Sequence, residues 1–461
     1  MTYGIEELIQ KRKGENLSLH SRYINPQFAK VLQTIGFDKN YSRAVGPYLY
    51  DNEGNEYLDF LSGYGVFAIG RNHPEIKRVL KEFIDLDTAS LVQMEAPLLS
   101  GLLAETLVKR VNVEGVDTVF FTNSGTEANE CAIKYARGAT SRARILFLDH
   151  AFHGLTTGSL SLNGNDEFRD GFGALLPGCE KIPQNDLNRL ETELKKKDVA
   201  AFVFEPVQGK GIYLPEENFL PQAQKLCQKY GTLFVADEIQ TGFGRTGKWF
   251  GFEHWGLSPD IVTVSKALSG GMVPVGATMS RRWIYDKIFS RMDKCVVHSS
   301  TFGQNNMAMV AGLATLAILE NEKLVDKAKE TGEYLLSRLQ RLKEKHEWVK
   351  EIRGKGLMIG IECGKPSSLK NRIRWETIQR INTSLFGELL VMPLMAKHKI
   401  LTQVSGHEQA IVKILPPLII TKDHADRFVA AMDDVLSECG RIAGPLWDMG
   451  KRLARAGRGN S

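Results

Sequence analysis

Short apolar segments rich in Val, Ile and Phe alternate with longer stretches whose apolar residues have helical spacing. These apolar segments are residues 117–122, 145–149, 200–205, 232–237 and 261–265. The alternation predicts an α/β fold with a mostly parallel sheet, because parallel strands need a crossover and a helix usually supplies it. Ligands of open α/β sheets bind outside the carboxyl ends of the strands. We therefore expect the chemistry where these segments end.

After about residue 305 the pattern changes to long helical stretches and then to a mixed region. The expected helices are 307–319, 322–345 and 423–438, and the expected strands lie within 350–363 and 410–420. We interpret this region as a smaller α+β domain that the N-terminal segment completes. The predicted division is an N-terminal segment at 1–60, a large domain at 61–325 and a small domain at 326–461.

The composition argues against several classes of function. The chain has 59 Lys and Arg against 54 Asp and Glu, and a net charge of +5 in 461 residues predicts no nucleic-acid partner. No basic stretch followed by an apolar one opens the chain and no apolar run could cross a bilayer, so we expect neither a secretory signal nor a membrane segment. The six cysteines form no Cys-x-x-Cys pair, which predicts no metal site and a reducing, cytoplasmic location.

The end of the chain, residues 451–458, is basic and contains no acid. Such tails are usually solvated. The alternative is a peripheral contact with an anionic lipid surface, which vesicle binding by intact and truncated protein would distinguish.

A candidate anion site follows the first of the apolar segments. Residues Asn123 to Glu127 open a helical stretch, and Gly125 allows backbone N–H groups to approach an anion closely. The helix N-terminus adds partial positive charge. Ser124, Gly125 and Thr126 are therefore candidates for binding a phosphate, with simple helix capping as the alternative.

Two further segments end in groups suited to a flat heteroaromatic ring. His150, Phe152 and His153 follow residues 145–149, and Phe152 could stack on such a ring, although a lone Phe is commonly core and a lone His structural. Asp237 ends a strongly apolar segment, where a carboxylate needs a cationic or hydrogen-bonding partner. A protonated pyridine nitrogen would serve, and a structural ion pair is the alternative.

Lys266 comes directly out of the apolar segment 261–265, at the sheet edge expected for Asp237. Most lysines lie on the surface. An amine at the end of a buried strand can lose its charge through desolvation, which makes it a competent nucleophile for Schiff-base formation.

The glycine-rich stretch 242–247 matches the dinucleotide-binding pattern G-x-G-x-x-G, and Asp260 lies downstream at a suitable distance. However, residues 237–241 separate the stretch from its strand, and residues 248–252 do not open a convincing helix. We interpret it as a glycine-rich loop. The alternative interpretation, a nicotinamide-dependent oxidoreductase, is supported by this pattern alone.

Taken together and in this order, the segments resemble class III aminotransferases, a branch of the fold-type I enzymes that use pyridoxal 5′-phosphate (PLP), and their motifs are closest to the putrescine- and ornithine-type ω-aminotransferases. The matching stretches are 123–129, 152–154, 205–209, 237–242, 244–247, 265–268, 300–303 and 353–357. The resemblance implies a large domain with a mostly parallel, seven-stranded sheet flanked by helices, and a smaller α+β domain built from both ends of the chain. It also implies a homodimer with shared sites. The implied reaction moves an amino group from a terminal amine or amino acid to a keto acid or aldehyde by a ping-pong Schiff-base mechanism.

The resemblance also implies roles for individual residues. Lys266 would form the Schiff base with PLP, and Asp237 would keep the ring nitrogen protonated, so both are expected to be catalytic. The other expected cofactor-binding residues are Ser124, Gly125, Thr126, Phe152, His153, Glu205, Gln240 and Thr301. Of these, Phe152 would stack on the ring, Glu205 would stand on the substrate side, Gln240 would approach the ring hydroxyl, and Thr301 would reach the phosphate of the partner subunit.

The sequence departs from the family pattern at Lys413, where many relatives carry an arginine that binds a substrate carboxylate. Lysine lacks the planar fork that allows bidentate recognition. Tyr64, Val66 and Phe67 suit an alkyl-chain or otherwise hydrophobic substrate, or else form dimer core. The alternatives are an amine on a lipid-like or secondary-metabolite substrate, and another PLP reaction such as that of an aminomutase, racemase or decarboxylase.

Overall fold

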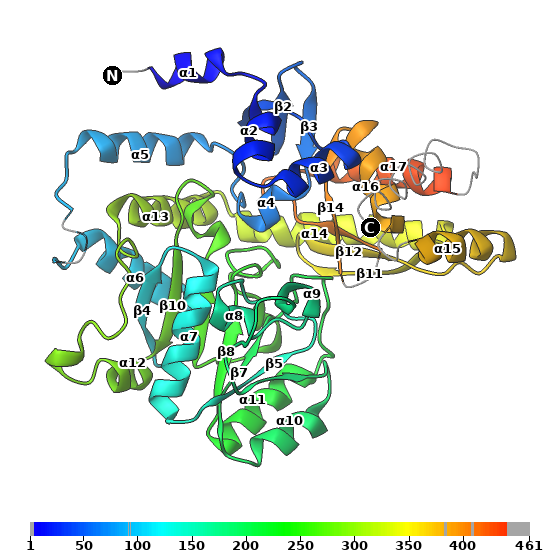
Figure 1. Cartoon of the computed structure of the whole chain (residues 1–461). Coiled ribbons are helices and arrows are strands. Elements are labelled where there is room, and N and C mark those ends of the chain that lie inside the picture. Colours follow the sequence, from blue (N-terminus) through cyan, green and yellow to red (C-terminus); the bar gives the residue numbers. More distant parts are fainter. Residues whose placement is uncertain (1–3, 91, 93, 382–384, 407–409, 440–461) are drawn as a thin grey trace.

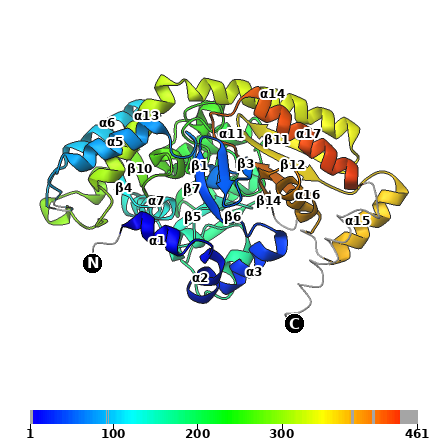
Figure 2. The ribbon, with the colours of Figure 1, turned by 90° about the horizontal axis from the view of Figure 1, so that it is seen from above.

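The computed structural model describes residues 4–90, 92, 94–381, 385–406 and 410–439. Figures 1 and 2 show an α/β body and a smaller part in which the N-terminal strands lie beside helices from the end of the chain. The basic stretch 451–458 lies outside the described residues. In the ranges that are described, no helix is both long and apolar enough to cross a membrane.

A seven-stranded sheet forms the centre of the body, as expected from the sequence. Its order is β4 (Val116–Thr122), β10 (Gly276–Arg281), β9 (Ile261–Val264), β8 (Leu233–Asp237), β7 (Val199–Phe204), β5 (Arg144–Leu148) and β6 (Cys179–Ile182). Only β10 runs antiparallel to its neighbours. The five expected apolar segments are strands of this sheet, and β6 and β10 are strands that the sequence did not reveal.

Helices cover both faces of this sheet, which explains its apolar strands. All residues of β7 and β8 are buried, so their Val, Phe and Ala side chains pack on both sides instead of alternating with polar ones. The helices of the body are α5 (Pro74–Asp85), α6 (Leu98–Val111), α7 (Gly125–Thr140), α10 (Leu187–Leu194), α11 (Phe219–Tyr230), α12 (Arg282–Ile288) and α13 (Asn306–Asn321). The parallel strands β4, β5, β6, β7, β8 and β9 thus bring their carboxyl ends to one edge of the sheet.

The glycine-rich stretch 242–247 lies in turns, and the 3₁₀ helix η1 (Gly251–Trp255) follows it. No α-helix opens there, so the stretch is the loop that the sequence predicted.

A second sheet of four antiparallel strands has the order β11 (Val349–Lys355), β12 (Met358–Cys363), β15 (Ile411–Ile414) and β14 (Gln403–Ser405). The strand expected within 350–363 is therefore a hairpin. The strand expected within 410–420 ends at Ile414, because Pro416 and Pro417 have no N–H to donate to a ladder. Helices α14 (Leu324–Lys345) and α17 (Lys422–Cys439) pack against each other beside this sheet (Figure 2).

The N-terminal segment joins the end of the chain. Helices α1 (Ile5–Lys11), α2 (Asn16–Tyr23) and α3 (Pro26–Ile35) precede strands β1 (Tyr41–Val45), β2 (Tyr48–Asp51) and β3 (Glu56–Asp59), and β3 pairs with β13 (Ile400–Leu401). Phe60 stacks on Phe428 of α17, with ring centroids 4.6 Å apart. Ser62 Oγ donates to Leu415 O at 2.5 Å, a contact between residues 353 positions apart.

The remaining helices are short or peripheral: α4 (Ser62–Gly65), α8 (Thr157–Leu160), α9 (Asp166–Arg169), α15 (Leu369–Ile381), α16 (Leu385–Ala396), and the 3₁₀ helices η2 (Lys266–Ser269) and η3 (Met292–Lys294). In α4, Ser62, Gly63, Tyr64 and Gly65 all have positive φ angles, from 46° to 90°. Four consecutive residues in this conformation form a strained turn, and such strain is characteristic of functional sites.

Candidate active site

Lys266 begins the 3₁₀ helix η2 immediately beyond β9, at the carboxyl edge of the sheet. Its φ of 37° is in the left-handed region, which is uncommon for a residue with a side chain. Burial lowers the pKa of Lys266, although the charges of Asp237 and Glu205 act in the opposite direction. The structure therefore places an amine with a lowered pKa beside the carboxylates of Asp237 and Glu205.

Asp237 ends β8 and is 3% exposed. Its Oδ2 accepts hydrogen bonds from His153 Nδ1 and Asn129 Nδ2, both at 2.7 Å, and its Oδ1 accepts one from the backbone N of Ile239 at 3.0 Å. Because Oδ2 has two donors and Oδ1 only one among the described residues, Oδ1 has room for a further donor.

His153 is buried and oriented by this carboxylate. A carboxylate can only accept, so the proton between the two residues belongs to Nδ1. Burial alone would lower the pKa of His153, but the hydrogen bond and the charge of Asp237 raise it above its ordinary value. The buried Nε2 has no hydrogen-bond partner among the described residues. His153 thus supports Asp237 and leaves one ring nitrogen unpaired.

Asn129 is a member of this cluster to which the sequence assigned no role. It lies within α7, where it is 1% exposed, and Nδ2 also donates to His153 O at 2.7 Å. Its Oδ1 accepts from Thr263 Oγ1 of β9 at 2.9 Å. The available signal was a polar residue three and four positions before the apolar Ala132 and Ile133, on the same face of the helix, which alone does not reveal a partner.

The predicted phosphate site lies at the N-terminus of α7. Ser124 is the N-cap, and its Oγ accepts a hydrogen bond of 3.3 Å from Glu127 N. A Cβ on Gly125 would lie 2.8 Å from Ile239 Cδ1, so a larger residue there would have to displace the Ile239 side chain. Thr126 Oγ1 forms hydrogen bonds with Thr156 Oγ1 at 2.7 Å and Ser159 Oγ at 2.6 Å. The first turn of a 16-residue helix presents its N–H groups at this point, which suits an anion.

Glu205 and Phe152 lie beyond the ends of β7 and β5. Glu205 Oε1 accepts from Gly209 N at 2.8 Å, and its Oε2 accepts from Phe152 N at 3.1 Å. Burial raises the pKa of Glu205, while the charge of His153 acts in the opposite direction. The Phe152 ring packs edge to face against Phe168, with centroids 5.4 Å apart.

Gln240 and Lys413 are directly connected, although they come from different sheets. Lys413 of β15 donates from Nζ to Gln240 Oε1 at 2.9 Å, and Gln240 Nε2 donates to Tyr64 O at 3.0 Å. Thr301 is exposed, and among the described residues it has no hydrogen bond to this cluster. Its neighbour Ser300 accepts from Asn123 Nδ2 at 2.8 Å, which places the segment beside the end of β4.

These features fit PLP. Among the described residues, Lys266 Nζ has no hydrogen-bond partner, so the amine is not committed to another group. Asp237 Oδ1 offers an acceptor position to a protonated ring nitrogen, and the N-terminus of α7 offers N–H groups to a phosphate. An aldehyde, a basic ring nitrogen and a phosphate are the three groups that such an arrangement would hold.

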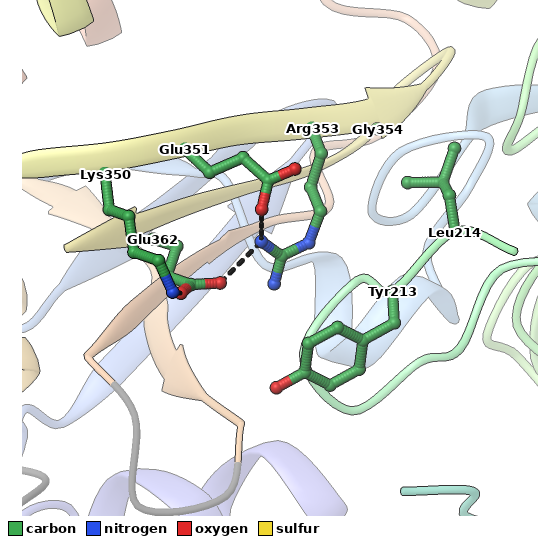
Figure 3. Close-up of a pocket in the computed structure, with 7 residues that line it drawn as sticks. All are labelled: Tyr213, Leu214, Lys350, Glu351, Arg353, Gly354 and Glu362. Carbon is green, nitrogen blue, oxygen red and sulfur yellow. Dashed lines mark hydrogen bonds and ion pairs between the residues drawn. The ribbon is translucent and has the colours of Figure 1, made fainter. Parts of the chain in front are cut away.

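A separate hollow of about 510 Å³ lies against the second sheet (Figure 3). Its lining residues are Tyr213, Leu214, Lys350, Glu351, Arg353, Gly354 and Glu362, none of which was predicted as a site residue. Arg353 Nη1 donates to Glu351 and Glu362, both at 2.6 Å, and its Nη2 donates to Gly211 O at 2.8 Å. Arg353 therefore fixes the loop that contains Gly209 and Gly211.

Comparison with known proteins identifies the family. Residues 33–436 match the family described as aminotransferase class-III. The aminotransferase PigE of Serratia sp. (strain ATCC 39006) is 34% identical over 92% of this chain, which spans only 53% of that relative's length. The putrescine aminotransferase of Pectobacterium atrosepticum is 35% identical over 92% of this chain and 89% of its own. An ornithine aminotransferase structure from Toxoplasma gondii superposes with a TM-score of 0.80 and 28% identity, covering 96% of this chain and 100% of that one.

The seven-stranded sheet, with a lysine and a carboxylate at its carboxyl edge, has the fold of the fold-type I enzymes that use PLP. Within that class, the chain belongs to the class III aminotransferases, and its cofactor is PLP. The fold, family and cofactor expected from the sequence are confirmed.

Proposed function

We propose that this aminotransferase takes its amino group from a terminal amine and delivers it to a keto acid or aldehyde, with Lys266 as the residue that carries PLP. The observation that supports this most directly is the half-buried Lys266 beside Asp237, at the edge where six parallel strands end. The similarity to putrescine and ornithine aminotransferases supports a terminal amine as donor.

Bound PLP supplies an electron sink for the charge that forms when a substrate carbon loses its proton. Lys266 Nζ accepts that proton and returns it to a neighbouring carbon, which its lowered pKa favours because the amine is readily uncharged. Asp237 Oδ1 would accept a hydrogen bond from the ring nitrogen of bound PLP, and its charge would favour the protonated form of that nitrogen. His153 and Asn129 hold Asp237 in place for this purpose.

The other predicted site residues take positions consistent with binding. Ser124, Gly125 and Thr126 hold the phosphate at the N-terminus of α7. Phe152 would cover a face of the ring, and Glu205, whose carboxylate accepts from Phe152 N, would stand on the substrate side. Gln240 would donate its second amide N–H to the ring hydroxyl oxygen.

The substrate side favours an apolar chain. Tyr64 is 45% exposed and stands in the strained turn of α4, where its carbonyl contacts Gln240. Val66 and Phe67 follow it and are half-buried. We propose that these side chains line the path of an alkyl amine, such as a diamine, an ω-amino acid or an amine on a lipid-like chain.

We propose a homodimer in which Thr301 of one subunit completes the phosphate site of the other. The exposed Thr301 and the 61% exposed Phe302 beside it support a contact at this segment.

The pairing of β3 with β13 supports a division into an N-terminal segment at 1–60, a large domain at 61–325 and a small domain at 326–461. The six cysteines are free, which supports a cytoplasmic location.

The proposal is tested by mixing the PLP-loaded enzyme with single amine donors and following the cofactor's absorbance. A panel of a diamine, an ω-amino acid, a long-chain alkylamine and an α-amino acid distinguishes the donor classes. We expect the first three to change the spectrum faster than the α-amino acid. If no donor changes it, or if nitrogen-labelled donor yields only a rearranged or decarboxylated product, transfer of an amino group is the wrong reaction.

A further inference from the structure

Lys413 is a buried lysine whose hydrogen bonds are made within the protein. It is 5% exposed in β15, and Nζ donates to Gly209 O at 2.6 Å and to Gln240 Oε1 at 2.9 Å. The Tyr64 ring centroid lies 5.9 Å from the same nitrogen. The amine of Lys413 therefore joins three segments of the chain beside the Lys266 site.

The same contacts determine which way the Gln240 amide points. An amide can present either its oxygen or its nitrogen, but a lysine amine facing it as a donor requires the oxygen. The nitrogen then donates one of its two N–H groups to Tyr64 O at 3.0 Å, which leaves the other N–H for a ligand. The fit is close, because a Cβ on Gly209 would lie 2.5 Å from Gln240 Oε1.

We propose that Lys413 is a positioning residue, which fixes the amide of Gln240 with an N–H toward the ring hydroxyl of PLP, and that it is not a clamp for a substrate carboxylate. This inference rests on the proposed role of Gln240. It assigns to Lys413 a function different from that of the arginine found at this position in many relatives. On this proposal, Lys413 does not provide a bidentate binding site for a substrate carboxylate.

The surroundings of Lys413 argue against a carboxylate clamp. Burial, together with the charges of Lys266 and Arg245, lowers the pKa of Lys413 to about 7, although Glu205 acts in the opposite direction. An uncharged amine still has two N–H groups, which match the two acceptors Gly209 O and Gln240 Oε1. The amine is thus committed to two acceptors within the protein, and a single lysine nitrogen cannot offer a carboxylate two parallel donors.

A double-mutant cycle on cofactor affinity tests the proposal. PLP is titrated into apoenzyme of the wild type, Lys413→Met, Gln240→Ala and the double variant, and the dissociation constant is measured by the change in protein fluorescence. We expect Lys413→Met to weaken PLP binding about tenfold in the wild-type background. Without Lys413 the Gln240 amide is no longer held with an N–H toward the cofactor, so one hydrogen bond to PLP is weakened. In the Gln240→Ala background the same substitution should change the constant less than about twofold, because the residue through which it acts is missing.

The control is Lys350→Met, which removes a lysine from the same sheet whose Nζ pairs with Glu362 at 2.7 Å instead of the site (Figure 3). Lys350→Met should leave the PLP affinity unchanged. Lys413→Arg keeps hydrogen-bond donors at the position, so it should retain most of the PLP affinity that Lys413→Met loses. If Lys413→Met does not fold, Lys413→Gln takes its place in the cycle with the same expectation, since an amide does not enforce one orientation of Gln240.

Two results would overturn the proposal. One is an equal loss of PLP affinity in both backgrounds. The other is unchanged PLP affinity with a selective loss of kcat/KM for keto acids relative to aldehydes, because that result would identify Lys413 as a carboxylate-binding residue. The cycle measures cofactor binding only, so a failure of the proposed donor class would not change its result.

Discussion

Replacement of Asp237 by asparagine removes one charge and keeps the shape of the side chain. Asp237 is 3% exposed and accepts from three donors, namely His153 Nδ1, Asn129 Nδ2 and Ile239 N. An asparagine must turn its own N–H₂ toward one of these donors. We expect this mismatch to lower the free energy of unfolding by about 1–3 kcal/mol.

The effect on the reaction should be larger than the effect on stability. Removal of one partner from a buried charge pair costs about 3–5 kcal/mol, and here the partner would be the protonated ring nitrogen. At 1.36 kcal/mol per factor of ten, the rate of proton removal should fall by roughly two to four orders of magnitude. The assay is a single turnover of the variant with saturating PLP and a reactive amine donor, followed by stopped-flow absorbance.

Asp186→Asn provides the matched control, because Asp186 caps α10 by accepting from Arg189 N at 2.8 Å and lies outside the site. Asp and Asn cap helices about equally well, so this variant should keep the wild-type rate. If Asp237→Asn, folded and loaded with PLP, turns over within about threefold of the wild type, Asp237 does not neutralise a ring charge and the reasoning fails.

Three further outcomes are expected. Borohydride reduction of the holoenzyme should fix a pyridoxyl group on Lys266, and Lys266→Ala should lose both this label in peptide mass spectra and turnover; a labelled peptide elsewhere would show that another lysine carries PLP. Burial raises the pKa of Glu238 from 4.5 to about 7, so between these pH values the folded state holds a proton that the unfolded state has lost. Glu238 therefore contributes stability that is fully present below about pH 4.5 and is lost as the pH rises through 7. Glu238→Gln should therefore remove a fall on the order of 3 kcal/mol between pH 5 and pH 8 in urea unfolding, and an unchanged pH dependence would contradict this. Phe60→Ala should cost about 3–5 kcal/mol of unfolding free energy, because Phe60 and its stacking partner Phe428 are both fully buried; a loss below about 1 kcal/mol would show that the contact between the ends of the chain is dispensable.

The parallel strands and the side chains that follow them were accessible from the sequence. Buried parallel strands are continuous apolar runs, so Asp237 and Lys266 stand out as polar residues at the points where such runs stop. The strands β6 and β10 were not accessible. Their sequences, CEKI and GATMSR, are short or rich in small residues, and they become strands only through pairing with a neighbour.

The contacts of the supporting residues were not accessible from the sequence. Asn129 lies within a helix and Lys413 within a strand of another sheet, so neither follows an apolar strand as Asp237 and Lys266 do. Their relation to Asp237 and Gln240 depends on how distant elements pack, which no local pattern encodes. The family resemblance identified the position of Lys413 as unusual, but only the packing of β15 against the Gly209 loop reveals what the amine contacts.

The contact between Ser62 and Leu415 also bears on how the protein is made. Their separation of 353 residues means that a ribosome adding 5–20 residues per second leaves the first strands without their partners for roughly 20 to 70 s. During this interval Phe60 lacks its stacking partner Phe428 and β3 lacks the paired strand β13, since neither has yet been synthesised. The nascent N-terminal segment should therefore expose apolar surface until the end of the chain is synthesised, whereas the strands of the seven-stranded sheet, within residues 116–281, are complete well before then.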